Sequence, residues 1–298
     1  MVYKKYYLKT FLILFLCLPA GLSSLQAQVI HGVVRDSVSK EPVSFANVTL
    51  LKKDLGVSCD VEGRFEFDLN DEKDDLLISS VGYENKVISP QSYKGELYIA
   101  LVQKALVLNE VVIDYKKKKY SGTKHLGLSR KYKVQKSIPF GTEFCSYIEN
   151  TEYKEGKVKA VYLDLKKEKE FDYQASYNIR FYEYDKLEKK PGRELYGQNL
   201  MVFPDNKTYE LKIDVDSLNI IFPRNGICVG VEVINTRYEG KLKSMAVVAP
   251  RILFTHTERK IITWNRYRNK EWRIGTTKSQ VREDFVNAMI NIDVVIEK

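Results

Sequence analysis

The sequence of 298 residues is poor in the residue types that carry most enzyme chemistry. None of its three histidines, His31, His125 and His256, is followed three residues later by a glutamate, the spacing of paired zinc ligands in a metallocarboxypeptidase. It has no Gly-x-Ser-x-Gly motif and no glycine-rich phosphate loop. The sequence therefore predicts no enzyme activity, no cofactor and no metal site, although a glycosidase-type carboxylate pair stays open because acidic residues are numerous.

Cysteine is also scarce. One of the four lies at the N-terminal end, and the others, Cys59, Cys145 and Cys228, show no Cys-x-x-Cys spacing. Three such residues indicate neither a zinc site nor a redox motif, and they allow at most one disulfide. Their separation in space, which decides whether Cys145 and Cys228 pair, does not follow from the sequence.

Long apolar runs are absent, even at the N-terminus. Three early lysines precede the short run Phe11–Leu18, and small residues follow up to Ala27. This pattern predicts a secretory signal peptide over residues 1–27, and Leu16 before Cys17 disfavours lipidation. No later stretch is long enough to cross a bilayer, so we expect an exported protein without a membrane span in the mature chain.

A strongly basic domain is absent, although the formal net charge is +9. Residues 28–113 carry nine Lys and Arg against fourteen Asp and Glu, whereas residues 114–136 carry nine against one. The basic charge is thus concentrated in the leader and in one short segment. We expect no nucleic-acid surface.

Strand signals dominate residues 28–113 and predict a small antiparallel β-sandwich. Gly63 is expected to supply a positive φ to a hairpin that joins residues 56–60 to residues 64–69. Short strand-like segments separated by turn residues cover Val29–Asp36, Val43–Lys53, Gly56–Asp60, Arg64–Leu69, Asp75–Tyr83, Glu96–Leu101 and Leu108–Ile113.

Five motifs in this region carry a resemblance to a known family. They are G-V-V-R-D (Gly32–Asp36), P-V-S-F-A-N-V (Pro42–Val48), G-V-S-C-D-V-E-G-R-F (Gly56–Phe65), L-L-I-S-S-V-G-Y-E (Leu76–Glu84) and L-N-E-V-V-I (Leu108–Ile113). In this order they resemble the carboxypeptidase-regulatory-like domain of Bacteroidetes envelope proteins, which also precedes the plug of many TonB-dependent receptors. The resemblance implies a prealbumin-like or Ig-like sandwich.

The same resemblance gives a role to the break in the strand pattern after Leu76–Ile78. Ser79 and Ser80 would end an inner strand, and Gly82 would allow a sharp turn. Tyr83 would then lie across the open end of the sandwich, with its hydroxyl at the solvent edge. The stretch is expected to be structural.

Residues 114–136 are predicted to be a solvated basic linker, because four lysines follow one another and no apolar period is present. Lys116, Lys117, Lys118 and Lys119 either keep two domains apart or contact an anionic lipid surface.

Residues 137–298 predict a second β-sandwich, of jelly-roll type. This length is too short for a receptor barrel of 22 strands. The segment Ile213–Ile234 resembles a recurrent C-terminal domain that follows the same first module and has no established activity.

One hairpin of the second domain offers a candidate ligand surface. Trp264, Tyr267 and Trp272 of the segment T-W-N-R-Y-R-N-K-E-W lie beside Arg266, Arg268 and Arg273. The aromatic faces either bind a sugar or a peptide, or the tryptophans fill the core while the arginines face water.

The sequence thus predicts an exported, non-enzymatic, all-β envelope protein, periplasmic or associated with the outer membrane. Its first domain would be an adaptor or spacer and its second a binding sandwich. The expected partner is another envelope protein, with polysaccharide or an anionic lipid surface as alternatives. Two other functions stay open, a carbohydrate-binding accessory protein and an envelope hydrolase with two carboxylates of perturbed pKa in one cleft.

Overall fold

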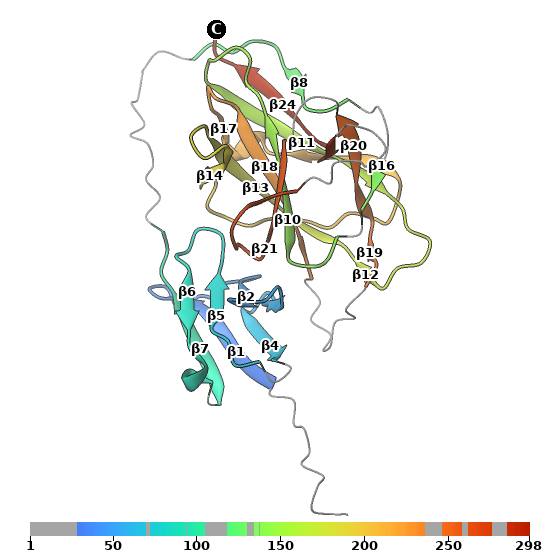
Figure 1. Cartoon of the computed structure of the whole chain (residues 1–298). Coiled ribbons are helices and arrows are strands. Elements are labelled where there is room, and N and C mark those ends of the chain that lie inside the picture. The colour runs from blue at the N-terminus through green and yellow to red at the C-terminus, as the bar shows by residue number, and fades with distance from the viewer. Residues whose placement is uncertain are drawn as a thin grey trace, which may run out of the picture.

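The chain is built from β-strands. A computed structural model describes residues 29–69, 72–93, 95–104, 118–129, 134–136, 138–235, 246–257, 262–275 and 285–298. Within these ranges there is no α-helix, and the only helical turns are η2 (Pro90–Ser92) and η3 (Asp216–Leu218). The strands form two bodies that follow one another along the chain (Figure 1). The predicted all-β fold is confirmed.

The first body is a sandwich of two small sheets. One has three strands in the order β4 (Arg64–Asp68), β1 (Val29–Asp36) and β7 (Glu96–Leu101). The other has four strands in the order β3 (Gly56–Ser58), β2 (Asn47–Leu50), β5 (Leu76–Ser79) and β6 (Lys86–Ile88). The sandwich is not purely antiparallel, because β7 runs parallel to β1. The chain passes through the other sheet between these two strands, and such a long connection permits parallel pairing.

The turn at Gly63 joins the two sheets. Its φ is +73°, as expected, and a Cβ there would lie 2.4 Å from the Val34 carbonyl oxygen. The predicted hairpin is nevertheless wrong, since β3 pairs with β2 and β4 pairs with β1. Val57 of β3 and Phe65 of β4 both enter the core from opposite sheets, which a hairpin within one sheet would not allow.

The end of β5 follows the geometry that the resemblance implied. Ser79 and Ser80 are buried, and Gly82 has a φ of +77°. The Tyr83 hydroxyl donates to Asp36 Oδ2 over 3.1 Å. Tyr83 thereby links this corner to the end of β1.

The second body is a larger sandwich. Its seven-stranded sheet has the order β14 (Lys190–Glu194), β13 (Ser176–Asp185), β18 (Ile227–Ile234), β10 (Thr142–Ile148), β21 (Thr263–Tyr267) and β22 (Arg273–Ile274), with β15 (Leu200–Val202) paired to β13. Its eight-stranded sheet has the order β23 (Phe285–Ala288), β20 (Arg251–Thr257), β11 (Gly156–Lys166), β24 (Ile290–Ile296) and β8 (Lys124–Leu126), with β16 (Tyr209–Asp214) and β17 (Ile221–Phe222) on β11 and β9 (Val134–Gln135) on β20. A separate pair joins β12 (Tyr173–Gln174) and β19 (Val248–Ala249). The predicted second sandwich is confirmed.

Alternation along the strands divides this sandwich into an inner and an outer side. In β13, Tyr177, Ile179 and Phe181 lie in the core between the two large sheets. Successive side chains of a strand point to opposite faces, so the intervening residues, Asn178 and Arg180, point outward. These outward residues are buried as well, because the first sandwich covers part of this face.

Part of the predicted linker belongs to the second sandwich. Residues 124–126 form β8, which pairs with β24, and residues 134–135 form β9, so this stretch is not a solvated connector throughout. Lys118 forms an ion pair with Glu297, while Lys116 and Lys117 lie outside the described residues. Edge strands this short are held by backbone hydrogen bonds to the neighbouring strand. They therefore show no apolar periodicity from which the sequence could predict them.

Candidate functional site

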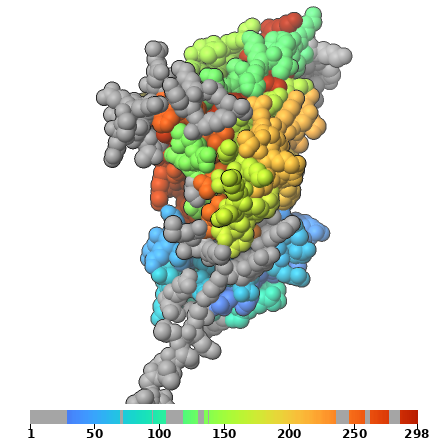
Figure 2. Space-filling view, turned by 90° about the vertical axis from the view of Figure 1, so that its right-hand side faces the viewer, coloured from blue at the N-terminus to red at the C-terminus, as the bar shows by residue number. Residues whose placement is uncertain are grey.

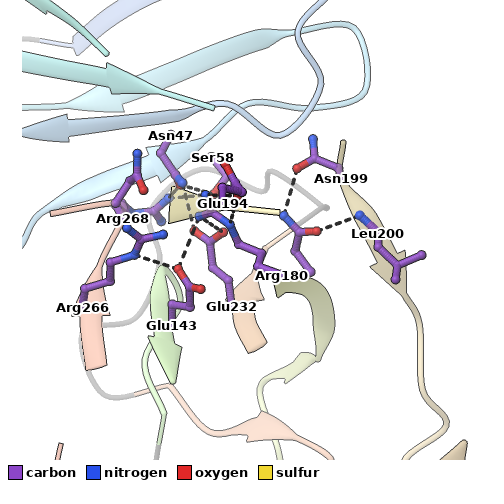
Figure 3. A network of polar contacts seen from close by, with 12 residues as sticks. Asn47, Ser58, Glu143, Arg180, Glu194, Asn199, Leu200, Glu232, Arg266 and Arg268 are labelled. Atoms are coloured by element: carbon purple, nitrogen blue, oxygen red, sulfur yellow. Dashed lines mark hydrogen bonds and ion pairs between the residues drawn. The ribbon is translucent and has the colours of Figure 1, made fainter. Parts of the chain in front are cut away.

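Charged side chains from four neighbouring strands gather on the outer face of the seven-stranded sheet. β10 contributes Glu143, β13 Arg180, β18 Glu232 and β21 Arg266, and all four are buried. The strand register places Glu143 opposite Glu232 on one side and opposite Arg266 on the other. In Figure 3 these side chains lie directly beneath the sheet of the first sandwich.

Glu143 is the centre of this network. Its Oε2 accepts from Arg266 Nε over 2.8 Å and from Arg180 Nη1 over 3.3 Å. Its Oε1 accepts from the Tyr182 hydroxyl over 2.7 Å, and that hydroxyl in turn accepts from Arg266 Nη2 over 2.7 Å. A Cβ at Gly230 would lie 2.2 Å from Glu143 Oε1, so the absent side chain makes room for the carboxylate.

Arg180 connects Glu143 to two further carboxylates. Its Nε and Nη2 donate to Glu194 Oε1 over 3.0 and 2.8 Å. Its Nη1 lies 3.8 Å from Glu232 Oε2. Burial opposes the charge of Arg180, but its acidic neighbours and Tyr182 raise its pKa well above the ordinary value. The guanidinium therefore stays charged.

Residues of the first sandwich complete the network across the boundary between the two sandwiches, which we call the joint. Asn47 Nδ2 donates to Glu232 Oε1 over 2.9 Å. Arg268 Nη1 donates to Asn47 Oδ1 and to Ser58 Oγ, both over 2.6 Å, as Figure 3 shows. The Arg268 side chain is 1% exposed and is among the largest fully buried side chains. A buried guanidinium requires such acceptors, so the joint depends on both sandwiches.

Further polar contacts surround this centre. Asn199 Nδ2 donates to the Ser44 carbonyl over 3.2 Å, and Asn269 Nδ2 donates to Asn85 Oδ1 over 3.2 Å. Lys270 Nζ donates to the Lys53 carbonyl and to Asp54 Oδ1. Figure 2 shows one face of the molecule, where the blue first sandwich lies against the yellow-green part of the second.

The turn that carries Arg268 has an unusual backbone. Arg268 and Asn269 have φ values of +41° and +62°, and the Lys270 N–H donates to the Tyr267 carbonyl over 3.0 Å. A bulky residue with positive φ is strained and persists only where its surroundings fix it. The backbone of Gly141 accepts the Arg268 N–H over 2.7 Å. The turn is thus held in the shape that inserts Arg268 into the joint.

The two central carboxylates differ in their surroundings. Burial raises the pKa of Glu232 above its ordinary value of 4.5, and the nearby Arg180 only partly offsets this effect. Glu143 receives three hydrogen bonds, as described above, whereas Glu232 receives one from Asn47. The ionised form of Glu232 is therefore the less well stabilised member of the pair.

The segment around the tryptophans was predicted either to form a ligand-binding aromatic face or to bury its tryptophans in the core with its arginines facing water. The structure differs from both predictions. Arg266 does not face water, because it is bound to Glu143 and its Cζ lies 4.1 Å from the centre of the Trp272 ring. Trp264 is buried at 6% exposure, outside the core between the sheets, while Trp272 and Tyr267 are half-buried. Trp272 packs against a small outer cluster of Cys145, Cys228 and Tyr182. The four predicted residues lie close together but do not form an open aromatic face.

The carboxylate pair that a hydrolase would require is present only in part. Glu143 and Glu232 lie opposite each other, and the pKa of Glu232 is perturbed. Their exposures are 0% and 2%, so they do not line a cleft that a substrate could enter. In the described part of the chain, no three His, Cys, Asp or Glu side chains gather as metal ligands.

Sequence reasoning missed most of this network. It named Arg266 and Arg268 but not Glu143, Arg180, Glu232 or Asn47. One usable signal was present, a single glutamate within the apolar strand Ile227–Ile234. A lone charge in such a strand requires a buried partner.

The family comparison agrees with the first sandwich. A model of the CarboxypepD_reg-like domain matches residues 30–113. Residues 30–113 are a CarboxypepD_reg-like domain. None of the curated proteins matches the sequence. The match covers the first sandwich, including Asn47 and Ser58 of the joint, and does not extend to the second sandwich.

Two solved structures show only loose likeness. A structure of infectious bursal disease virus, Gt strain, has 9% identity and a TM-score of 0.26, over 90% of this chain and 63% of the viral chain. A DUF3823 family protein from Bacteroides uniformis has 9% identity and a TM-score of 0.19, over 89% of this chain and 98% of that one.

Proposed function

We propose that this chain is an exported, non-enzymatic envelope protein whose CarboxypepD_reg-like domain is a rigid adaptor. The second sandwich would bind a partner, expected to be another envelope protein at the periplasmic or outer-membrane face. The N-terminal leader pattern supports export. None of the described ranges contains a helix that could span a bilayer.

The observation that carries this proposal is the buried joint. A flexible spacer needs no specific contact between its domains, whereas here Arg268, Asn47 and Glu232 form a continuous network across the boundary. Buried charges contribute little net stability but demand one defined geometry. Fixed orientation is what an adaptor requires.

The other two functions receive less support. A carbohydrate-binding face requires exposed aromatic rings, and Trp264 is buried while Arg266 covers Trp272. A hydrolase requires access to its carboxylates, and Glu143 and Glu232 are covered by the first sandwich. An anionic lipid contact through the lysine run would compete with the ion pair of Lys118.

The test is cross-linking of the tagged full chain in envelope extract, followed by mass spectrometry. An adaptor predicts a discrete protein partner, with less of it recovered with Arg268→Ala than with Arg224→Ala, whose side chain is 69% exposed. Retention on polysaccharide or lipid, with no protein partner, would contradict the proposal. Equal recovery with both variants would contradict the part that requires a rigid joint.

A further inference from the structure

Strand pairing brings Cys145 and Cys228 together. Cys145 lies on β10 and Cys228 on the neighbouring antiparallel strand β18. The register pairs Cys145 with Gly230 and Cys228 with Tyr147. The two cysteines are therefore diagonal neighbours, two positions apart in register, and both point to the outer face of the sheet.

The two thiols form one buried cluster. Both are 0% exposed and free in this structure, and they pack with Tyr182. Burial first, and then the hydrogen bond and charge of the adjacent Cys228 thiol, raise the pKa of Cys145 well above its ordinary value. The third cysteine, Cys59, lies in the core of the first sandwich and offers neither of them a competing partner.

We propose that Cys145 and Cys228 are a disulfide-forming pair, linked across β10 and β18 when the chain folds in an oxidising compartment. The oxidant is a small or protein disulfide. One thiol, as its thiolate, attacks this disulfide to give a mixed disulfide and releases one reduced thiol. The other cysteine then attacks the mixed disulfide and releases the second. The pair loses two protons and two electrons, and the oxidant gains them.

Burial determines when this reaction takes place. Thiols that are buried and protonated are inert toward exchange. The link therefore forms while β10 and β18 pair, before the aromatic residues close over the cluster. After closure the same burial protects the bond from reductants.

The aromatic surroundings supply a spectroscopic reporter. Trp264 lies opposite Cys145 on β21, and Trp272 packs against the same cluster. These are the two tryptophans of the chain. Because a disulfide quenches nearby indole emission, opening the link is expected to raise tryptophan fluorescence in the folded protein.

The test begins with the full chain, unfolded and reduced, and then refolded with glutathione disulfide and glutathione. The thiols are alkylated in denaturant without reduction, and the chain is digested with trypsin. The expected product is peptide 137–154 joined to peptide 225–237, with Cys59 alkylated. Alkylation of Cys145 and Cys228 to the same extent as Cys59 would overturn the proposal, as would links that involve Cys59 instead.

Two controls separate the pair from general oxidation. Cys59→Ser is expected to keep the link and the fluorescence change, whereas Cys145→Ser is expected to lose both. The reduced chain, once folded, is expected to form the link about tenfold or more slowly than the refolding chain in the same buffer. Equal rates would overturn the role assigned to burial.

Discussion

Arg268 Nη1 donates to Asn47 Oδ1 over 2.6 Å, although one residue belongs to the last third of the chain and the other to its first sandwich. The same nitrogen donates to Ser58 Oγ over 2.6 Å. The turn that carries Arg268 has a strained backbone, so forming this contact costs conformational energy. Arg268 thereby links the two sandwiches directly through two hydrogen bonds.

Arg268→Ala is expected to lower the free energy of unfolding by about 2–4 kcal/mol, because buried hydrogen bonds of a charged group are lost. Arg268→Lys is expected to cause a smaller loss than Arg268→Ala, because it keeps the charge but lacks the planar guanidinium group. Chemical denaturation measures both, with the exposed Arg224→Ala as control. Cysteines placed by Asn85→Cys and Asn269→Cys, whose present amides lie 3.2 Å apart, report the joint through a short bismaleimide cross-linker. Unchanged cross-linking in Arg268→Ala would show that the joint does not need this residue.

The central carboxylates are expected to respond differently to neutralisation. Glu143→Gln leaves the Arg180 and Arg266 guanidinium groups without their shared carboxylate and is expected to cost about 3–5 kcal/mol at neutral pH. Glu232→Gln keeps an oxygen for Asn47 and removes a poorly stabilised charge, so it is expected to cost less than about 1 kcal/mol. Chemical denaturation of both variants at pH 7 measures these losses in the free energy of unfolding. Equal losses would contradict the different roles assigned to Glu143 and Glu232.

Glu232 also sets a pH dependence with a defined sign. Its pKa in the folded chain is raised above 4.5. Its contribution to stability is therefore fully present below the pKa of the unfolded chain and is lost as pH rises through the folded pKa. The wild-type chain is expected to lose stability relative to Glu232→Gln as pH rises, until the difference levels off. A wild-type chain that gains stability relative to Glu232→Gln as pH rises would refute the shift.

Asp36 has the opposite dependence. Hydrogen bonds from the Ser39 and Val38 backbone, and from Gln103 and Tyr83, lower the pKa of Asp36 to about 2. The stability that it contributes is present above its unfolded pKa near 3.8 and is lost as pH falls through about 2. Asp36→Asn is expected to be less stable at pH 7 and to show a flatter decline in acid. Parallel acid-unfolding curves of the wild-type chain and Asp36→Asn would contradict the lowered pKa of Asp36.

Gly82 is expected to be required at the joint for more than its backbone angle. Its φ is +77°, and a Cβ there would lie 2.3 Å from the Gly197 carbonyl oxygen of the second sandwich. Gly95 has a similar φ of +67° with nothing within 4 Å of that position. Gly95→Ala should therefore cost only the backbone strain, about 1–2 kcal/mol.

Gly82→Ala should lower the free energy of unfolding by more than Gly95→Ala does. It should also reduce the cross-linking between positions 85 and 269. Denaturation curves and the bismaleimide assay are measured on both variants. Identical effects in the two assays would mean that the contact with Gly197 is dispensable.

Local structure could be predicted where one short segment contains the necessary pattern. The strands Val29–Asp36 and Glu96–Leu101 were expected with the bounds that the structure has. The hairpin at Gly63 was predicted wrongly, because a glycine with positive φ is equally compatible with a turn between sheets. Pairing partners depend on the whole sandwich, which no local pattern encodes.

The joint could not be predicted, because its residues come from distant strands. The charges Glu143, Arg180 and Arg266 look like the solvent-facing positions of ordinary alternating strands, and the lone Glu232 in its apolar strand indicates a buried partner without naming it. The first sandwich converts that outer face into an interior, and only the three-dimensional arrangement reveals this. The same applies to Cys145 and Cys228, which the register of two strands brings together.

The polar joint also restricts how this protein can be recombined. A CarboxypepD_reg-like domain grafted from elsewhere must present an acceptor at position 47 and one at position 58 to Arg268, and a donor at position 47 to Glu232. A graft with apolar residues there would bury two charges without these partners, at about 1–3 kcal/mol or more for each group. The two halves of the chain are therefore matched to each other, and a substitution at Asn47 is expected to cost less when positions 232 and 268 change with it.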